Sequence, residues 1–395
     1  MPRVSVQCCI AGGGPAGMML GLLLARAGVV VTVLEKHADF LRDFRGDTIH
    51  PSTLMLMDEL GLLERFLKLP HQRVTRLAFQ FGERTVPMAD FSRLGPGFMA
   101  IMPQWDFLNF LAEEAKRHPS FTLRMEAEVT GVIERDGQVH GVTVEGGEDV
   151  IADLVVGADG RDSSVRRGMA IETFGAPMDV LWFRLGRSPG DAGDTMGRID
   201  AGRILVMINR GQHWQMGYVI PKGTLETIRA QGIEAFRADV ARLAPFARDH
   251  VGDIGSWDDV KLLTVLVDRL KTWHRPGLLC IGDAAHAMSP IGGVGVNLAV
   301  QDAVAAANIL AGPLRERRVT DADLQRFQRR REFPTRLIQG FQVTMQREII
   351  ARVLETRGGS MTLPIPMRLI SGTPALQRLV GRVFGLGVRP EHIRG

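Results

Sequence analysis

The residues of this sequence best suited to chemistry lie in three glycine-rich turns. The first turn, residues 12–17 (Gly-Gly-Gly-Pro-Ala-Gly), lies between an apolar run and an apolar helical segment. There Gly12 allows a tight turn, Gly14 lets a pyrophosphate approach the backbone, and Gly17 lets helix and strand pack closely. The helix start adds free N–H groups and a partial positive charge of about half a unit. Glu35, after the next apolar run, is placed to accept hydrogen bonds from an adenosine ribose.

Two later turns indicate which dinucleotide binds. Residues 155–160 (Val-Val-Gly-Ala-Asp-Gly) end an apolar run, and residues 279–286 end another before the glycine-rich segment 292–297. Asp283 follows its run directly and can hold a sugar or ribityl hydroxyl. The backbone N–H groups of segment 292–297 could face the edge of a flavin on which negative charge accumulates during reduction.

The three turns, in this order and spacing, resemble the signatures of the single-component FAD-dependent aromatic hydroxylases. This family includes para-hydroxybenzoate hydroxylase-like and ubiquinone-biosynthesis hydroxylase-like flavoprotein monooxygenases, and the resemblance covers roughly residues 3–312. It implies FAD as cofactor, in contact with the following positions: Gly12, Gly14, Pro15, Ala16, Gly17, Glu35, Lys36, Arg45, Gln104, Asp159, Gly160, Gly282, Asp283, Pro290, Gly293, Gly295, Val296 and Asn297. Arg45 could equally be a surface arginine, and Gln104 a polar residue that begins a helix.

The resemblance also implies a reaction. NADPH or NADH would reduce FAD, oxygen would add to the flavin as a C4a-hydroperoxide, and the distal oxygen would be transferred to an aromatic, quinone-like or polyketide-like small molecule. Because the chain holds one dinucleotide fingerprint, we expect the nicotinamide to bind transiently. The protein must exclude water until the substrate arrives, since the oxygen would otherwise be lost as hydrogen peroxide.

The candidate catalytic residues are His213, Tyr218 and Arg184, with His286 as a further candidate base. Tyr218 is the only tyrosine of the chain, which excludes a relay of two tyrosines for ionising a phenol. A histidine near an apolar strand could be structural instead. Arg184 could bind a substrate carboxylate or extend into water from its strand. Residues 214, 216 and 218 could form one wall of a substrate cavity or pack in a core.

The elements that position these residues follow from hydrophobic periodicity. Residues 4–10, a helix over 15–27 and residues 29–34 form a β-α-β unit of a buried parallel sheet. Helices are expected over 51–61, 105–117, 295–310 and 321–355, a strand pair over 73–91, and a hairpin over 122–148 that turns at Asp136-Gly137. Period-2 patterns from 179 to 270 indicate an antiparallel sheet with a functional face.

The predicted fold class is therefore α/β. An FAD-binding Rossmann-like domain of the glutathione-reductase type would comprise residues 1–72, 92–178 and 276–312. An inserted antiparallel-sheet substrate domain would comprise residues 73–91 and 179–275, and a helical C-terminal region residues 313–395.

Composition and charge limit the compartment and the partners that we expect for the protein. The 395 residues include three cysteines without CxxC spacing, a pattern that favours neither a disulfide framework nor a metal site. The N-terminus lacks a signal-like segment, so we expect the protein in the cytoplasm. We expect it to be a monomer or a homodimer. Residues 356–395 carry six arginines against one glutamate. This basic region could touch a membrane, but capping of the FAD domain is favoured, and no aromatic interleaving suggests nucleic acid.

Other functions use similar turns. Flavin halogenases and FAD-dependent isoprenoid reductases share them, but the halogenase motif W-x-W-x-I-P is absent here. A flavin-free prenyl-binding protein is a non-enzymatic alternative, against which the intact glycines of residues 12–17 and 292–297 argue. A yellow purified protein would exclude it.

Overall fold

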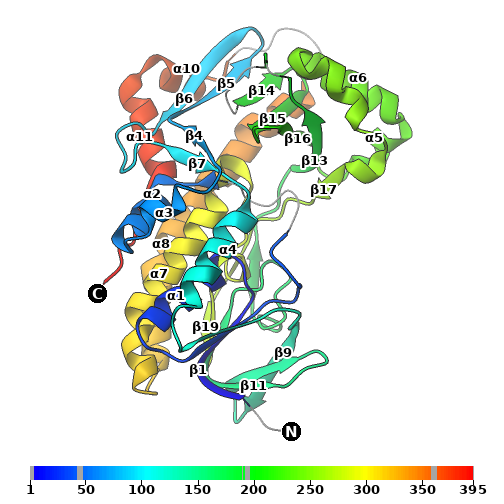
Figure 1. The fold of residues 1–395 in the computed structure, drawn as a ribbon. Helices are drawn as coiled ribbons and strands as arrows, with labels where there is room; N and C mark the ends of the chain where they lie inside the picture. Colours follow the sequence, from blue (N-terminus) through cyan, green and yellow to red (C-terminus); the bar gives the residue numbers. More distant parts are fainter. Residues whose placement is uncertain (1–3, 42–47, 189, 192–195, 357–362, 395) are drawn as a thin grey trace.

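The computed structural model describes residues 4–41, 48–188, 190–191, 196–356 and 363–394. The chain has a mixed α/β fold in which long helices run between two main sheets (Figure 1). The predicted fold class is confirmed, apart from details of individual elements given below.

The first sheet has the strand order β19-β20-β11-β1-β2-β8, and β10 and β9 extend it from β11. Its bounds are β1 Val4–Ala11, β2 Val31–Leu34, β8 Phe121–Arg124, β9 Val129–Arg135, β10 Gln138–Val144, β11 Val150–Gly157, β19 His274–Arg275 and β20 Leu278–Cys280. The central strands β20, β11, β1, β2 and β8 are parallel, and their apolar side chains are buried. As in any parallel sheet, their carboxyl ends meet at one edge, which brings the three glycine turns together.

The predicted hairpin over 122–148 was too long. Residues 121–124 form β8, which pairs in parallel with β2, and the hairpin begins only at Val129. Its turn lies where expected, with Asp136 and Gly137 both at positive φ, as a tight turn between antiparallel strands requires.

The helices that cover this sheet are α1 (Pro15–Arg26), α4 (Gln104–Ala115) and α7 (Val294–Arg315). Helix α1 packs between the other two. Segment Ile291–Arg315 is long and apolar enough to cross a membrane, but 78% of its most apolar window is buried inside the fold. Helix α7 therefore belongs to the protein core, in one apolar cluster with β1, β2 and α1.

The second sheet has the strand order β17-β13-β16-β15-β14-β5-β6. Its bounds are β5 Arg76–Phe81, β6 Arg84–Asp90, β13 Met178–Gly186, β14 Met196–Asp200, β15 Arg203–Asn209, β16 His213–Pro221 and β17 Lys261–Leu263. The pairs are antiparallel except that β14 runs parallel to β5. The sheet thus joins strands from both segments that the sequence assigned to a substrate domain, while the division into domains stays a prediction.

Helices that the periodicity did not predict cover one face of this second sheet. They are α5 (Leu225–Ala230), α6 (Ile233–Leu243) and the 3-10 helix η1 (Pro245–Asp253). Phe236 and Val240 of α6 pack against Phe183 and Leu185 of β13. Residues 179–263 therefore form sheet strands with a helical layer, where a sheet alone was expected, while β18 and β19 of the same predicted segment pair outside this sheet.

The remaining helices connect or cover the two sheets. Their bounds are α2 Pro51–Glu59, α3 Leu63–Phe66, α8 Asp321–Met345, α9 Ala351–Glu355, α10 Ile365–Gly372 and α11 Pro374–Gly385, with one π-helical turn, Gln346–Ile350, before α9. Small strands β3 (Thr48–Ile49), β4 (Gln72–Val74) and β7 (Met99–Ile101) form a third sheet, and β12 (Ile171–Thr173) pairs with β18 (Asp268–Leu270). Helices α10 and α11 lie against β6 at one end of the molecule (Figure 1).

Candidate functional site

The first glycine turn joins β1 to α1. Gly12 has φ +105°, and a Cβ there would lie 2.4 Å from the Ala158 carbonyl oxygen, so only glycine fits. A Cβ on Gly17 would lie 1.9 Å from the Gly12 carbonyl oxygen. A Cβ on Gly14, by contrast, would meet nothing within 4 Å. The turn is packed tightly on the protein side and open at the helix start, which is the shape needed to admit a phosphate group.

Glu35, at the end of β2, is held against this turn. Its Oε2 accepts a hydrogen bond from the Gly13 N–H at 3.0 Å, and its Oε1 accepts one from the His37 N–H at 3.1 Å. The half-buried carboxylate is thus fixed beside the glycines by backbone donors, while Lys36 is exposed. This position beside the first helix is the one that a ribose-binding acid occupies.

The second turn lies at the end of β11, next to the first. Asp159 Oδ2 accepts hydrogen bonds from the Ser164 N–H (2.8 Å) and hydroxyl (3.2 Å). Asp159 Oδ1 is buried, yet it has no hydrogen-bond partner among the described residues. Gly160 has φ +86° and open space beside it. A buried acceptor without a partner is costly, so this oxygen is suited to a ligand hydroxyl or N–H group.

The third turn follows β20 and contains Gly282, at φ +57°, and Asp283. The Asp283 carboxylate is about one-third exposed and pairs with Arg161 Nε at 3.2 Å. Arg161 also donates to the carbonyls of Thr264 and Met288. Arg161, which sequence reasoning missed, therefore ties the second turn to the third; its place directly after Gly160 was the available signal.

A buried charged network supports the third turn from behind. Asp302 of α7 accepts hydrogen bonds from the Gly282 N–H (3.0 Å), from His286 Nε2 (2.6 Å) and from Arg331 Nε (2.8 Å). Asp302 and Arg331 are fully buried. Burial raises the pKa of Asp302, but His286 and Arg331 outweigh burial, so the carboxyl pKa is lowered. His286 is held in this network and is 1% exposed, so it is not placed to act as a base on a substrate.

The glycine segment before α7 is fastened by residues from strand β3 and the start of α2. Gly292 and Gly293 both have positive φ. The Gly293 carbonyl accepts hydrogen bonds from the Thr48 hydroxyl (2.9 Å) and His50 Nε2 (3.1 Å). Burial lowers the pKa of His50 to about 4, although backbone carbonyls oppose this effect, so the imidazole is neutral at neutral pH. His50 was also missed; its only signal was its place before Pro51 at a helix start.

The other residues predicted for the cofactor have different surroundings. Asn297 is buried, and its Oδ1 accepts hydrogen bonds from the Ser52 and Thr53 hydroxyls, so this side chain faces α2. Val296 is also buried, Pro290 is half-buried, and Gly295 has little beside it. Gln104 begins α4 and is half-buried. Arg45 lies outside the described residues.

The candidate catalytic residues lie on opposite faces of the second sheet. Trp214, Met216 and Tyr218 alternate as expected, but they point toward α6: Tyr218 packs on Phe236, with ring centroids 5.5 Å apart. The Tyr218 hydroxyl donates to Asp239 at 3.3 Å, and burial raises its pKa to about 12. These three side chains therefore pack in the core between the second sheet and α6, and Tyr218 does not face a substrate cavity on this side of the sheet.

Arg184 and His213 lie on the other face of the same sheet, with Trp182. On this face Val180 and Val219 share an apolar cluster with Ile291 of the glycine segment. The face that carries Arg184 and His213 therefore meets the segment that leads into α7. Burial lowers the pKa of His213, and the positive charges of Arg184 and Arg210 lower it further.

The three turns and their surroundings fit FAD: an open helix start, a fixed carboxylate, and a buried acceptor without a partner lie at adjacent strand ends. Comparisons with known proteins agree. Residues 5–340 match the model of the FAD binding domain family. The chain is 34% identical over 386 residues to 6-methylpretetramide 4-monooxygenase of Streptomyces rimosus. The matched region covers 95% of this chain and 91% of that protein.

More distant similarities are found in sequence and in structure. The 3-demethoxyubiquinol 3-hydroxylase of Escherichia coli is 25% identical over 78% of this chain and 81% of its own. PqsL of Pseudomonas aeruginosa, solved in complex with 2-aminobenzoylacetate, superimposes with a TM-score of 0.76 at 21% identity, over 88% of this chain and 98% of its own. The chain belongs to the FAD binding domain family and is an FAD-dependent monooxygenase.

Proposed function

We propose that this enzyme uses NADPH or NADH and oxygen to hydroxylate a planar aromatic molecule of the polyketide type that carries an acidic hydroxyl. The observation that carries the proposal is that Arg184, Arg210 and His213 lie near one another on one face of the second sheet. Farther along the same face, Val180 and Val219 pack with Ile291 of the glycine segment. The 34% identity to an enzyme named for a pretetramide substrate supports the same substrate class.

The three glycine turns are the proposed FAD site. The residues proposed to hold it are Gly12, Gly14, Pro15, Ala16, Gly17, Glu35, Lys36, Gln104, Asp159, Gly160, Gly282, Asp283, Pro290, Gly293, Gly295 and Val296, with Arg45 on the basis of its sequence position alone and Asn297 acting through α2. When bound, FAD supplies the redox chemistry and the activation of oxygen. The chain's own residues position the substrate and exclude water.

His213 is the proposed proton acceptor for the substrate. It is half-buried, and burial together with Arg184 and Arg210 lowers its pKa, so the imidazole is neutral near pH 7 and can accept a proton. The two arginines would then hold the resulting phenolate, whose charge they complement. An ionised phenol ring is richer in electrons and thus a better acceptor of an electrophilic oxygen atom. Trp182 supplies an aromatic surface beside this group.

The proposed compartment is the cytoplasm. All three cysteines are free and buried, and burial raises the pKa of Cys280 to about 12, so this thiol stays protonated and unreactive. Buried thiols of this kind need no oxidising environment.

The test is turnover of the FAD-loaded enzyme with a panel of aromatic polyketides, monophenols and quinone precursors, followed by product mass. We expect a gain of one oxygen atom with a polyketide, coupled to nicotinamide oxidation. His213→Gln should lower kcat by about a hundredfold near neutral pH, and Arg184→Gln should raise KM by about tenfold with little change in kcat.

Tyr218→Phe is the matched control, because Tyr218 lies on the same strand as His213 but on the opposite face. Products without the extra oxygen, or a preference for a monophenol over every polyketide, would contradict the proposed substrate class. If both His213→Gln and Arg184→Gln behave like Tyr218→Phe, the proposed roles of these two residues are wrong.

A further inference from the structure

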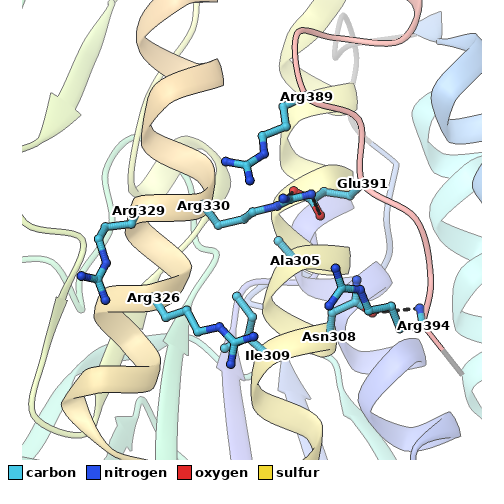
Figure 2. Close-up of a pocket in the computed structure, with 9 residues that line it drawn as sticks. All are labelled: Ala305, Asn308, Ile309, Arg326, Arg329, Arg330, Arg389, Glu391 and Arg394. Carbon is cyan, nitrogen blue, oxygen red and sulfur yellow. Dashed lines mark hydrogen bonds and ion pairs between the residues drawn. The ribbon is translucent and has the colours of Figure 1, made fainter.

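A cavity of about 310 Å³ lies between α7, α8 and the chain segment after α11, on a part of the molecule that the proposed reaction does not use. Its floor is formed by Ala305, Asn308 and Ile309 of α7 (Figure 2). Helix α7 begins beside the glycine segment at Val294, and a helix rises about 1.5 Å per residue. The cavity therefore lies about 20 Å along α7 from the proposed flavin site.

The cavity is lined by an unusual excess of positive charge. Five arginines and a single carboxylate surround it, and Figure 2 shows them coming from α8 and from the last described segment: Arg326, Arg329, Arg330, Arg389, Arg394 and Glu391. Glu391 is already used, since it accepts two hydrogen bonds from Arg330, at 2.7 and 3.1 Å, and one from the buried Arg331 at 3.3 Å.

Four of the lining arginines thus remain without an acidic partner within the described residues: Arg326, Arg329, Arg389 and Arg394. Like charges gathered around one cavity repel one another. Glu391 offsets the charge of Arg330, whereas the four other arginines are exposed and, within the described residues, only water screens their repulsion. A bound anion would relieve it.

The backbone that carries these arginines is fixed from several sides. Asn308 Nδ2 donates to the His392 carbonyl at 2.8 Å, and the Arg394 N–H donates to Asn308 Oδ1 at 3.0 Å. The Ile393 N–H donates to Glu59 Oε2 of α2 at 2.8 Å. Arg326 and Arg330 are one helical turn apart on α8. The backbone around the cavity is therefore set before any ligand arrives, and Figure 2 shows that the Arg329 side chain, unlike that of Arg326, points away from α7.

We propose that this cavity binds a phosphate-bearing anion with at least two negative charges, such as a diphosphate group. Planar guanidinium groups match phosphate oxygens in geometry and donate two hydrogen bonds at once. Ala305 and Ile309 give the floor an apolar part on which the carbon portion of such a ligand can rest. The anion can come from a soluble phosphorylated compound or from the headgroup of an anionic lipid.

The test uses the FAD-saturated enzyme, so that the proposed flavin site is filled, and titrates it with inorganic pyrophosphate by calorimetry. We expect one pyrophosphate per chain and an affinity that falls as salt rises. The double variant Arg326→Gln/Arg389→Gln should weaken binding by about tenfold or more. Arg336→Gln/Arg352→Gln removes the same charge from two arginines that lie outside the cavity and are exposed like Arg326 and Arg389, and it should leave binding within about twofold.

A second experiment distinguishes a soluble phosphorylated compound from a lipid headgroup. It measures binding of the enzyme to vesicles that contain phosphatidate and to vesicles of phosphatidylcholine alone. Binding to phosphatidate vesicles that the double variant loses would support the site and identify a lipid headgroup as its source. Pyrophosphate binding without vesicle binding would support a soluble ligand. The proposal is overturned if neither probe binds the FAD-saturated enzyme, or if the cavity variant and its control weaken binding equally.

Discussion

The contribution of His50, which holds the glycine segment before α7, to the stability of the protein can be tested by changing the pH. Its side chain is fully buried, its Nε2 donates to the Gly293 carbonyl, and its Nδ1 has no hydrogen-bond partner among the described residues. Protonation at Nδ1 would therefore place a positive charge and a new donor in a buried site. The change we consider is His50→Gln, which keeps a neutral hydrogen-bond donor but removes the titrating group.

The expected magnitude follows from the two pKa values of the imidazole. Its pKa is about 6.5 in an unfolded chain and about 4 in the folded protein. Between these values the unfolded chain binds more protons, so the stability contributed by the neutral imidazole is present above the unfolded pKa and is lost as pH falls. From about pH 7.5 to about pH 5, His50 alone should lower the free energy of unfolding by about 2 kcal/mol.

The assay is urea denaturation of the FAD-loaded wild-type enzyme and the variant at both pH values. Other titrating groups contribute equally to both proteins, so the pH-dependent loss should be about 2 kcal/mol smaller in His50→Gln. His140→Gln, at a half-buried strand position, is the control for the loss of an imidazole elsewhere. The reasoning is refuted if wild type and His50→Gln lose the same stability between the two pH values.

Three further predictions concern the glycine turns, which are the proposed FAD site, and the second sheet. Gly12→Ala should reduce bound FAD at least about tenfold, measured as flavin absorbance relative to protein, because the added Cβ would meet the Ala158 carbonyl at 2.4 Å. Asp302→Asn should lower the free energy of unfolding by about 3 kcal/mol in denaturation experiments, since it removes the nearer of the two carboxylates that pair with the buried Arg331 and leaves only Glu391 at 3.3 Å. Tyr218→Phe should lose the contacts of its hydroxyl with Asp239 and Arg203, which costs about 1 kcal/mol of stability, and turnover should stay within about twofold.

Each of these has a clear contrary result. A full complement of flavin in Gly12→Ala would mean that the turn can move aside. Unchanged stability in Asp302→Asn would show that the network has other support. A large loss of turnover in Tyr218→Phe, with stability retained, would place Tyr218 in the reaction after all.

The three glycine turns could be predicted from the sequence because each depends on neighbouring residues. Gly12, Gly17 and Asp283 lie where a strand meets the next element. Short apolar runs followed by glycines mark these junctions in the sequence. The parallel order of the strands then brings the junctions together without further information. His50 and Arg161 were missed because their partners, Gly293 and Asp283, are far away in the sequence.

The substrate face could be predicted only in part. Period 2 correctly grouped Trp214 with Tyr218, but it does not tell which face of the sheet lies toward the proposed flavin site. Both faces of β16 are largely buried, so polarity does not separate them. Helices α5 and α6 cover the face of the sheet that carries Tyr218, so the opposite face is the one left for a substrate. These helices between the strands were not recognised from the sequence.

The contacts of Glu391 have a consequence for how the enzyme matures. Glu391 holds Arg331, Arg331 holds Asp302, and Asp302 holds the Gly282 N–H beside Asp283. A ribosome makes residue 391 long after it has made all three glycine turns. The support behind the third turn is therefore complete only after the chain up to residue 391 has been made, and we expect stable flavin binding from that point on.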